Sequence, residues 1–293
     1  MKFLFVAILL LSSTKAHAFG RKPVTTDPTI LLSDSLVKDL QCSTLTKDTV
    51  LATLQADAFS ADKELPVRNW PNAINIGHCW SLSHAQRIYY YLARLNGNPD
   101  DNAAHDYLEM VKGLGSLRVF NSPKTMDEFY SNLTAVPGRT PEGDIDFYQI
   151  ARFSSPLNFD LLIGNWARPQ DANENTYNLI KSELSKNRMP LIILRTSRVE
   201  QHVLLVKSAS APADDGSVNL TVYDSNYPGS DNTLTYSPKA REFYAPEIIP
   251  LFPGVDDPMM PVGIFVVDQG DMNTIQDILY NYYMDRCTAA VKK

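Results

Sequence analysis

Strand-like segments are concentrated in the C-terminal part of the chain. Residues 190–194 and 202–206 are short apolar runs rich in branched side chains, and residues 218–223 and 261–267 have the pattern of further strands. The earlier chain instead has apolar residues at helical spacing, most clearly after residue 79. Helices followed by strands are typical of an α+β fold. We therefore predict an α+β chain with two sub-lobes, a helical one followed by an antiparallel sheet.

The first residues have the features of a secretory signal peptide. Lys2 precedes an apolar run over residues 3–11, and Ala16-His17-Ala18 is a cleavage site of the small-x-small type. We expect a secreted or periplasmic protein without a membrane span, because no other stretch approaches the roughly 20 apolar residues of a spanning helix. The expected organisation is a signal peptide over 1–18, a helical N-terminal extension (a possible prosegment) over 19–60 and the main domain over 61–293.

The charge of the chain restricts its partners. With 27 basic and 33 acidic residues, the formal net charge is −6, and no long basic run occurs. An acidic surface disfavours nucleic acids and anionic membranes as partners. We therefore predict no nucleic-acid partner.

Three cysteines are present, Cys42, Cys79 and Cys287. In an oxidising compartment an odd number leaves one thiol unpaired. If Cys42 and Cys287 form a disulfide near the two ends of the mature chain, Cys79 remains free. The alternatives are that Cys79 pairs with one of the others or is a buried, inert thiol.

Cys79 lies where a loop meets a helix. Asn75, Ile76 and Gly77 read as loop, whereas the apolar residues that follow Cys79 recur at helical spacing: Ala85, Ile88, Tyr89 and Leu92. The unpaired N–H groups and the positive dipole end of a helix start favour a thiolate, the form of cysteine that attacks carbonyl groups. The sequence therefore predicts a cysteine nucleophile, which needs a base and an orienting group.

His202 and Asp224 are the candidates for these two roles. His202 opens one predicted strand, and Asp224 closes the next long one. If the two strands pair as antiparallel neighbours, Asp224 returns near His202 and can hold its imidazole in the required tautomer. The alternative for His202 is a structural histidine. Asp224 and Asn226 can also cap the turn at Pro228-Gly229, alone or together with the orienting role. Asn226 is the alternative orienting residue.

The other histidines of the mature chain are placed less well for a base. His78 is adjacent to Cys79, His84 lies within the same helix, and His105 opens an exposed-looking helix. Cys79 with His78 and His84 also lacks the spacing of a metal site, so we predict neither a metal nor another cofactor.

The negatively charged oxygen that develops during attack on a carbonyl needs hydrogen-bond donors. The backbone N–H of Cys79 is one candidate, because it lies at a helix start. Asn75 is the preferred side-chain donor and Asn72 the alternative, and either could equally be a turn residue.

The stretch Gly77-His78-Cys79-Trp80-Ser81 resembles the cysteine motif of papain-like cysteine peptidases. The order of Cys79, His202 and Asp224 is also similar, most of all to the bacterial branch with a Cys-His-Asp triad, the bacteriocin-processing-like peptidases. The resemblance covers residues 69–267. It implies a papain-like two-lobed fold and a thiol hydrolase that cleaves peptide bonds, in which Cys79 attacks, His202 moves the proton and Asp224 orients His202.

The chain departs from the papain pattern before the nucleophile. Ala73 stands where those peptidases have a glutamine that binds the oxyanion. This departure keeps a catalytically silent papain-fold binding protein as an alternative to a peptidase. A second alternative is an acyl transferase or amidase that uses the same triad. For the peptidase, we expect a peptide or protein substrate and a monomeric enzyme.

Overall fold

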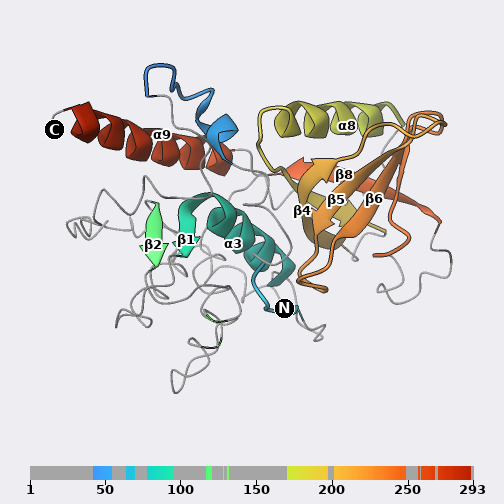
Figure 1. Cartoon of the computed structure of the whole chain (residues 1–293). Helices are drawn as coiled ribbons and strands as arrows, with labels where there is room; N and C mark the ends of the chain where they lie inside the picture. Colours follow the sequence, from blue (N-terminus) through green and yellow to red (C-terminus); the bar gives the residue numbers. More distant parts are fainter. Residues whose placement is uncertain are drawn as a thin grey trace, which may run out of the picture.

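A closed barrel of antiparallel strands is the main element of the computed structural model, with helices packed beside it (Figure 1). The structure describes residues 42–54, 64–69, 78–95, 117–120, 128, 131, 170–196, 201–248, 257, 259–267 and 270–291. The barrel consists of β3 (Leu191–Arg195), β4 (Gln201–Ala209), β5 (Val218–Tyr223), β6 (Asn232–Ser237), β7 (Glu242–Tyr244) and β8 (Pro261–Val267).

Each barrel strand pairs antiparallel with the next, and β8 returns to pair with β3. Closure gives every barrel strand a neighbour on both sides. Side chains of one parity fill the interior, because successive residues of a strand point to opposite faces. They form one continuous apolar cluster that includes Ile192, Leu194, Leu204, Val206, Leu220, Val222, Leu234 and Phe243.

The outer face of β3 and β4 is covered as well. Leu191, Ile193, Val203 and Leu205 belong to a second apolar cluster, which they share with the helices beside the barrel. Strand β3 is buried along its whole length for this reason. The two clusters, one inside and one outside the barrel wall, fix β4 from both faces.

Helix α3 (His78–Leu92) lies between the barrel and helix α9 (Gly270–Val291) (Figure 1). Every residue from 80 to 92 is buried. A helix covered on all sides is part of the core, which explains why polar residues also occur at buried positions. These are Ser81, Ser83, His84, Gln86 and Arg87.

One more helix and two short strands lie outside the barrel. Helix α8 (Gln170–Leu184) packs on β4, β7 and β8 (Figure 1). Strand β1 (Ala93–Leu95) follows α3 directly and forms a parallel pair with β2 (Arg118–Phe120). None of the described helices combines the length and apolarity needed to cross a membrane.

The predicted papain-like, two-lobed α+β fold was wrong. The described residues form mainly a closed six-stranded barrel with three α-helices, and the longest of these helices, α9, follows the sheet. Two strands caused the error. In β6 only Leu234 and Tyr236 are buried between polar residues, and β7 has three residues, so neither carries a strong apolar pattern. Without them the sheet cannot be recognised as closed.

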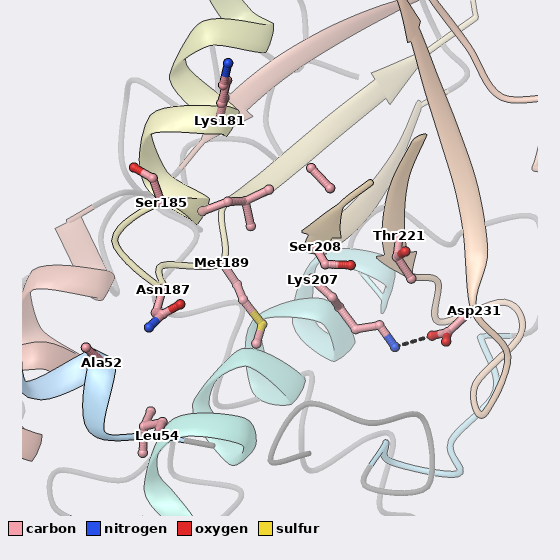
Figure 2. Close-up of a pocket in the computed structure, with 12 residues that line it drawn as sticks. Ala52, Leu54, Lys181, Ser185, Asn187, Met189, Lys207, Ser208, Thr221 and Asp231 are labelled. Atoms are coloured by element: carbon pink, nitrogen blue, oxygen red, sulfur yellow. Dashed lines mark hydrogen bonds and ion pairs between the residues drawn. The ribbon is translucent and has the colours of Figure 1, made fainter. Parts of the chain in front are cut away.

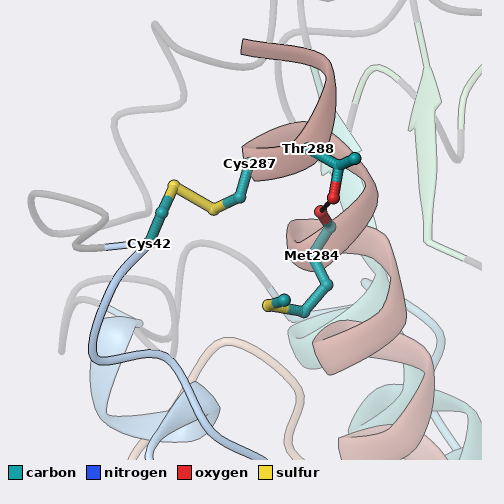
Figure 3. The surroundings of a disulfide bond; sticks show 4 residues. All are labelled: Cys42, Met284, Cys287 and Thr288. Atoms are coloured by element: carbon teal, nitrogen blue, oxygen red, sulfur yellow. Dashed lines mark hydrogen bonds between the residues drawn. A yellow bond between two sulfur atoms is a disulfide. The ribbon is translucent and has the colours of Figure 1, made fainter. Parts of the chain in front are cut away.

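Of the cysteine pairings that the sequence left open, the structure contains the disulfide between Cys42 and Cys287 (Figure 3). Cys79 is the free cysteine among the described residues. The bond joins the first described segment to α9. The same segment contains a turn of 3₁₀ helix, η1 (Val50–Thr53), which contacts α9. Leu51 and Leu54 belong to the same apolar cluster as α3 and α9, so residues 42–54 are packed as part of this core. The organisation predicted for residues 1–18 and the prosegment role of residues 19–60 stay predictions.

Candidate functional site

Cys79 lies in the first turn of α3 and is partly exposed, whereas Trp80 and the residues after it are buried. The start of α3 therefore presents the sulfur at the edge of the core. The predicted position at the start of a helix is observed.

The end of the ladder between β4 and β5 positions the histidine and the aspartate. The two strands are paired as far as Leu205 and Tyr223. Beyond this pair β5 ends, and a turn begins at Asp224. The Asp224 side chain reaches back to His202. The distance from His202 Nε2 to Asp224 Oδ1 is 2.6 Å, and both side chains are buried.

The backbone of Val203 faces the space that β5 has left. Alternate residues of β4 face β5, and Val203 follows the same alternation as Leu205. Helix α3 occupies this space: Ser83 Oγ donates to the Val203 carbonyl at 3.0 Å, and the Val203 N–H hydrogen-bonds the Cys79 sulfur. The nucleophile helix is thus docked on the backbone of the residue that follows His202.

Burial opposes ionisation of the Cys79 thiol, yet the pKa of Cys79 lies below its ordinary value. The hydrogen bond and positive charge of His202 outweigh burial, aided by the backbone N–H groups of Val203 and Trp80. Each of these donors stabilises the charged form of the sulfur. The arrangement favours a thiolate.

Burial lowers the pKa of His202, but the charge of Asp224, its hydrogen bond and the Cys79 sulfur together raise that pKa to about 10. Burial raises the pKa of Asp224, but the charge and hydrogen bond of His202 and the Asn226 N–H outweigh burial and hold that pKa below its ordinary value. Because Nε2 is bonded to Asp224, Nδ1 is the ring nitrogen left to exchange a proton with Cys79. The favoured state is a thiolate–imidazolium pair anchored by a carboxylate.

The pair of Cys79 and His202 should contribute most to the free energy of unfolding between pH 6.5 and 9.0. The contribution of His202 is complete below its ordinary pKa of 6.5 and is lost as pH rises through about 10. The contribution of Cys79 is complete above its ordinary pKa of 9.0 and is lost as pH falls through its lowered value. The sum is therefore largest between these two ordinary values and falls on either side. Urea unfolding of wild type and Cys79→Ser from below pH 6.5 to above pH 9.0 measures it. A difference in unfolding free energy between the two proteins that stays constant over this whole range would contradict it.

The structure brings Cys79, His202 and Asp224 together; the roles assigned to them stay predictions. In the described part of the chain, the hydrogen bonds of Asn226 go to Asp224 and Asn69 and not to the imidazole. Its N–H donates to Asp224 Oδ1 at 2.8 Å, and its side-chain oxygen accepts from Asn69 at 2.9 Å. Asn226 therefore supports Asp224.

The remaining candidates fall outside this arrangement. Asn75, Asn72, Ala73 and His105 lie outside the described residues, as does the His78 side chain. His84 is buried, forms an ion pair with Asp271 of α9 and stacks on Trp80. It joins the two helices.

The sequence analysis did not identify residues 64–69, which hold the turn that begins at Asp224. Asn69 donates from its backbone to the Ser225 carbonyl at 2.7 Å, and Glu64 accepts from the Gly229 N–H at 2.9 Å. The sequence offers only one signal, an acidic residue next to apolar Leu65 and Val67.

A cavity of about 720 Å³ lies elsewhere on the protein (Figure 2). It is bounded by η1, the C-terminal end of α8 and the strands β4 and β5, and its lining includes Ala52, Asn187, Met189 and Thr221. Cys79, His202 and Asp224 do not line it. The cavity is therefore separate from the site at Cys79.

In the part of the chain that the structure describes, no group of three or more His, Cys, Asp or Glu side chains is arranged to hold a metal ion. Comparison of the sequence with known proteins gave no matching family model and no matching curated protein.

Proposed function

We propose that the protein is a thiol hydrolase that cleaves peptide bonds, with Cys79 as nucleophile, His202 as proton carrier and Asp224 as the residue that orients His202. One observation carries the proposal: a buried imidazole bonded on one side to a carboxylate and on the other to a cysteine at the start of a helix. A nucleophile, a base and an orienting acid in this order are the parts of a catalytic triad.

The first half-reaction transfers the acyl group to sulfur. The Cys79 thiolate attacks the carbonyl carbon and forms a C–S bond, while the carbonyl electrons move to oxygen. When the tetrahedral intermediate collapses, the C–N bond breaks and the His202 imidazolium gives its proton to the leaving amine. The product is a thioester with Cys79 and a neutral His202.

The second half-reaction releases the acid. Neutral His202 takes a proton from water as the water oxygen attacks the thioester carbonyl. Collapse breaks the C–S bond, Cys79 leaves as a thiolate, and His202 retains the proton. The thiolate–imidazolium pair is restored, with Asp224 bonded to the imidazolium throughout.

The compartment forms part of the proposal. A disulfide persists in secreted and periplasmic proteins, which agrees with the predicted signal peptide. An oxidising compartment also requires that Cys79 be kept away from the other two cysteines, and their bond to each other satisfies this requirement.

Alkylation of Cys79 by iodoacetamide as a function of pH tests the proposal. A cysteine paired with imidazolium should react at neutral pH and show an inflection well below the roughly 8.5 of a free thiol. Peptide mapping identifies Cys79 as the labelled residue, and Cys79→Ala is the control. A panel of fluorogenic peptide amides then measures turnover. An inflection at the value of a model thiol would refute the proposal; a low inflection without turnover on peptides would restrict it to another acyl substrate.

A further inference from the structure

A buried carboxylate outside the triad contacts all three elements that carry the triad. Glu64 belongs to residues 64–69, which we call the 64–69 segment, and its side chain is fully buried. A buried charge requires several hydrogen-bonding partners, because its removal from water is costly. The identity of those partners shows what the carboxylate holds together.

The first partner is on the nucleophile helix. The Tyr90 hydroxyl of α3 donates to Glu64 Oε1 at 3.0 Å. The adjoining Leu65 N–H donates to Gln86 Oε1 of the same helix at 2.6 Å. Both Tyr90 and Gln86 are buried, so the 64–69 segment is fixed along α3, the helix that begins at Cys79.

The second partner is on the strand that carries His202. Lys207 Nζ donates to Glu64 Oε1 at 2.7 Å and also pairs with Asp231 (Figure 2). The Lys207 side chain is almost completely buried, whereas that of Asp231 is more than half exposed. Glu64 is therefore the buried counterion of Lys207 and joins the 64–69 segment to β4.

The third partner is in the turn that carries Asp224. The Gly229 N–H donates to Glu64 Oε2 at 2.9 Å. At the other end of the 64–69 segment, the Asn69 N–H and side-chain amide bond to Ser225 and Asn226. Between these ends the Arg68 guanidinium lies 5.2 Å from the centre of the Tyr227 ring. The segment thus runs beside the whole turn from Ser225 to Gly229.

We propose that Glu64 is a positioning residue that sets the relative placement of Cys79, His202 and Asp224 by joining α3, β4 and the turn after β5. The inference rests on the proposed function. A catalytic geometry needs support to within about 0.5 Å, which residues around the reacting groups provide. Glu64 contacts no member of the triad among its described bonds, so it acts through the elements that carry them.

The test compares Glu64→Gln with wild type in the alkylation profile of Cys79. Glutamine keeps the size of the side chain but removes the charge that binds Lys207. We expect the inflection to move toward that of a free thiol and the rate at neutral pH to fall about tenfold, the change that one unit of pKa produces. Above pH 9.5 the rates of the two proteins should converge. A purely structural role would lower the melting temperature and leave the profile of the folded protein unchanged.

Glu174→Gln is the matched control. The Glu174 side chain on α8 is about half exposed and pairs with Arg241, so the same chemical change there should leave the profile unchanged. Glu64→Asp keeps the charge but shortens the side chain, and we expect an intermediate shift. Tyr90→Phe removes the hydroxyl of α3 that donates to Glu64 and leaves the Glu64 carboxylate and the bond between Leu65 and Gln86 in place. Its profile decides the question if neither Glu64 variant folds.

The outcomes separate this inference from the proposed function. If wild-type Cys79 titrates as a free thiol, the proposed function fails and the inference fails with it. If wild-type Cys79 has a low inflection and folded Glu64→Gln has the same one, only the inference fails. If Glu64→Gln does not fold, an unshifted profile of Tyr90→Phe overturns the inference and a raised inflection supports it.

Discussion

His202→Ala is expected to abolish peptide hydrolysis, with kcat/KM falling by about 10⁴-fold or more. The imidazolium is the group that stabilises the thiolate and the group that protonates the leaving amine, so one substitution removes both effects. Cys79→Ala should be inactive to the same extent. Because the two residues act as a unit, the double variant should lose no more than either single variant.

Turnover of the best fluorogenic substrate by the three variants measures this effect. Thermal unfolding of each variant provides the control, since His202 is buried and its replacement also removes packing. Losses that add in the double variant would show that the two residues act separately. Substantial turnover by folded Cys79→Ala would assign the nucleophile to another residue.

Asp224→Asn is expected to lower kcat/KM by about 10³- to 10⁴-fold, because the amide cannot stabilise the imidazolium and favours the wrong tautomer. The inflection for alkylation of Cys79 should rise in the same variant, since the raised pKa of His202 depends chiefly on the charge of Asp224 once burial is overcome. Both changes come from one missing negative charge.

Asn226→Ala is the comparison that separates the two candidate orienting residues. It leaves intact the backbone N–H that supports Asp224 and removes only the side-chain bond to Asn69. We expect a much smaller loss of activity than for Asp224→Asn. Equal losses would mean that Asn226 orients the imidazole in the working enzyme.

The arrangement around Cys79 could be predicted because its signals are local. The helical spacing of the apolar residues after Cys79 can be recognised within a short stretch of sequence, and the observed helix α3 agrees with it. The strands that carry His202 and precede Asp224 are apolar and β-branched, and their antiparallel pairing is observed at Leu205 and Tyr223. Once two strands are neighbours, the place where the shorter one ends fixes which residues meet.

The closed barrel could not be predicted for the opposite reason. Strand β4 continues past its apolar run through Lys207 and Ser208. Strand β6 buries only two residues, too few to make its alternation with polar residues stand out. Closure depends on β7, a strand of three residues that is no longer than an ordinary loop segment. Which strands meet across a barrel is a non-local property that no short window contains.

The role inferred for Glu64 was also invisible in the sequence. An acidic side chain is usually exposed, and composition alone gives no reason to bury this one. Its partners Tyr90, Lys207 and Gly229 are distant from it in sequence. Only the assembled barrel and α3 bring them within hydrogen-bonding distance.

The bond between Cys42 and Cys287 closes the chain into a covalent ring that encloses every element carrying the candidate site. A single proteolytic nick anywhere within this ring opens a loop but separates no fragment. The nicked protein would migrate as one species on a non-reducing gel and as two after addition of dithiothreitol. Purity judged without a reductant would therefore overlook internal cleavage, including cleavage that the protein performs on itself.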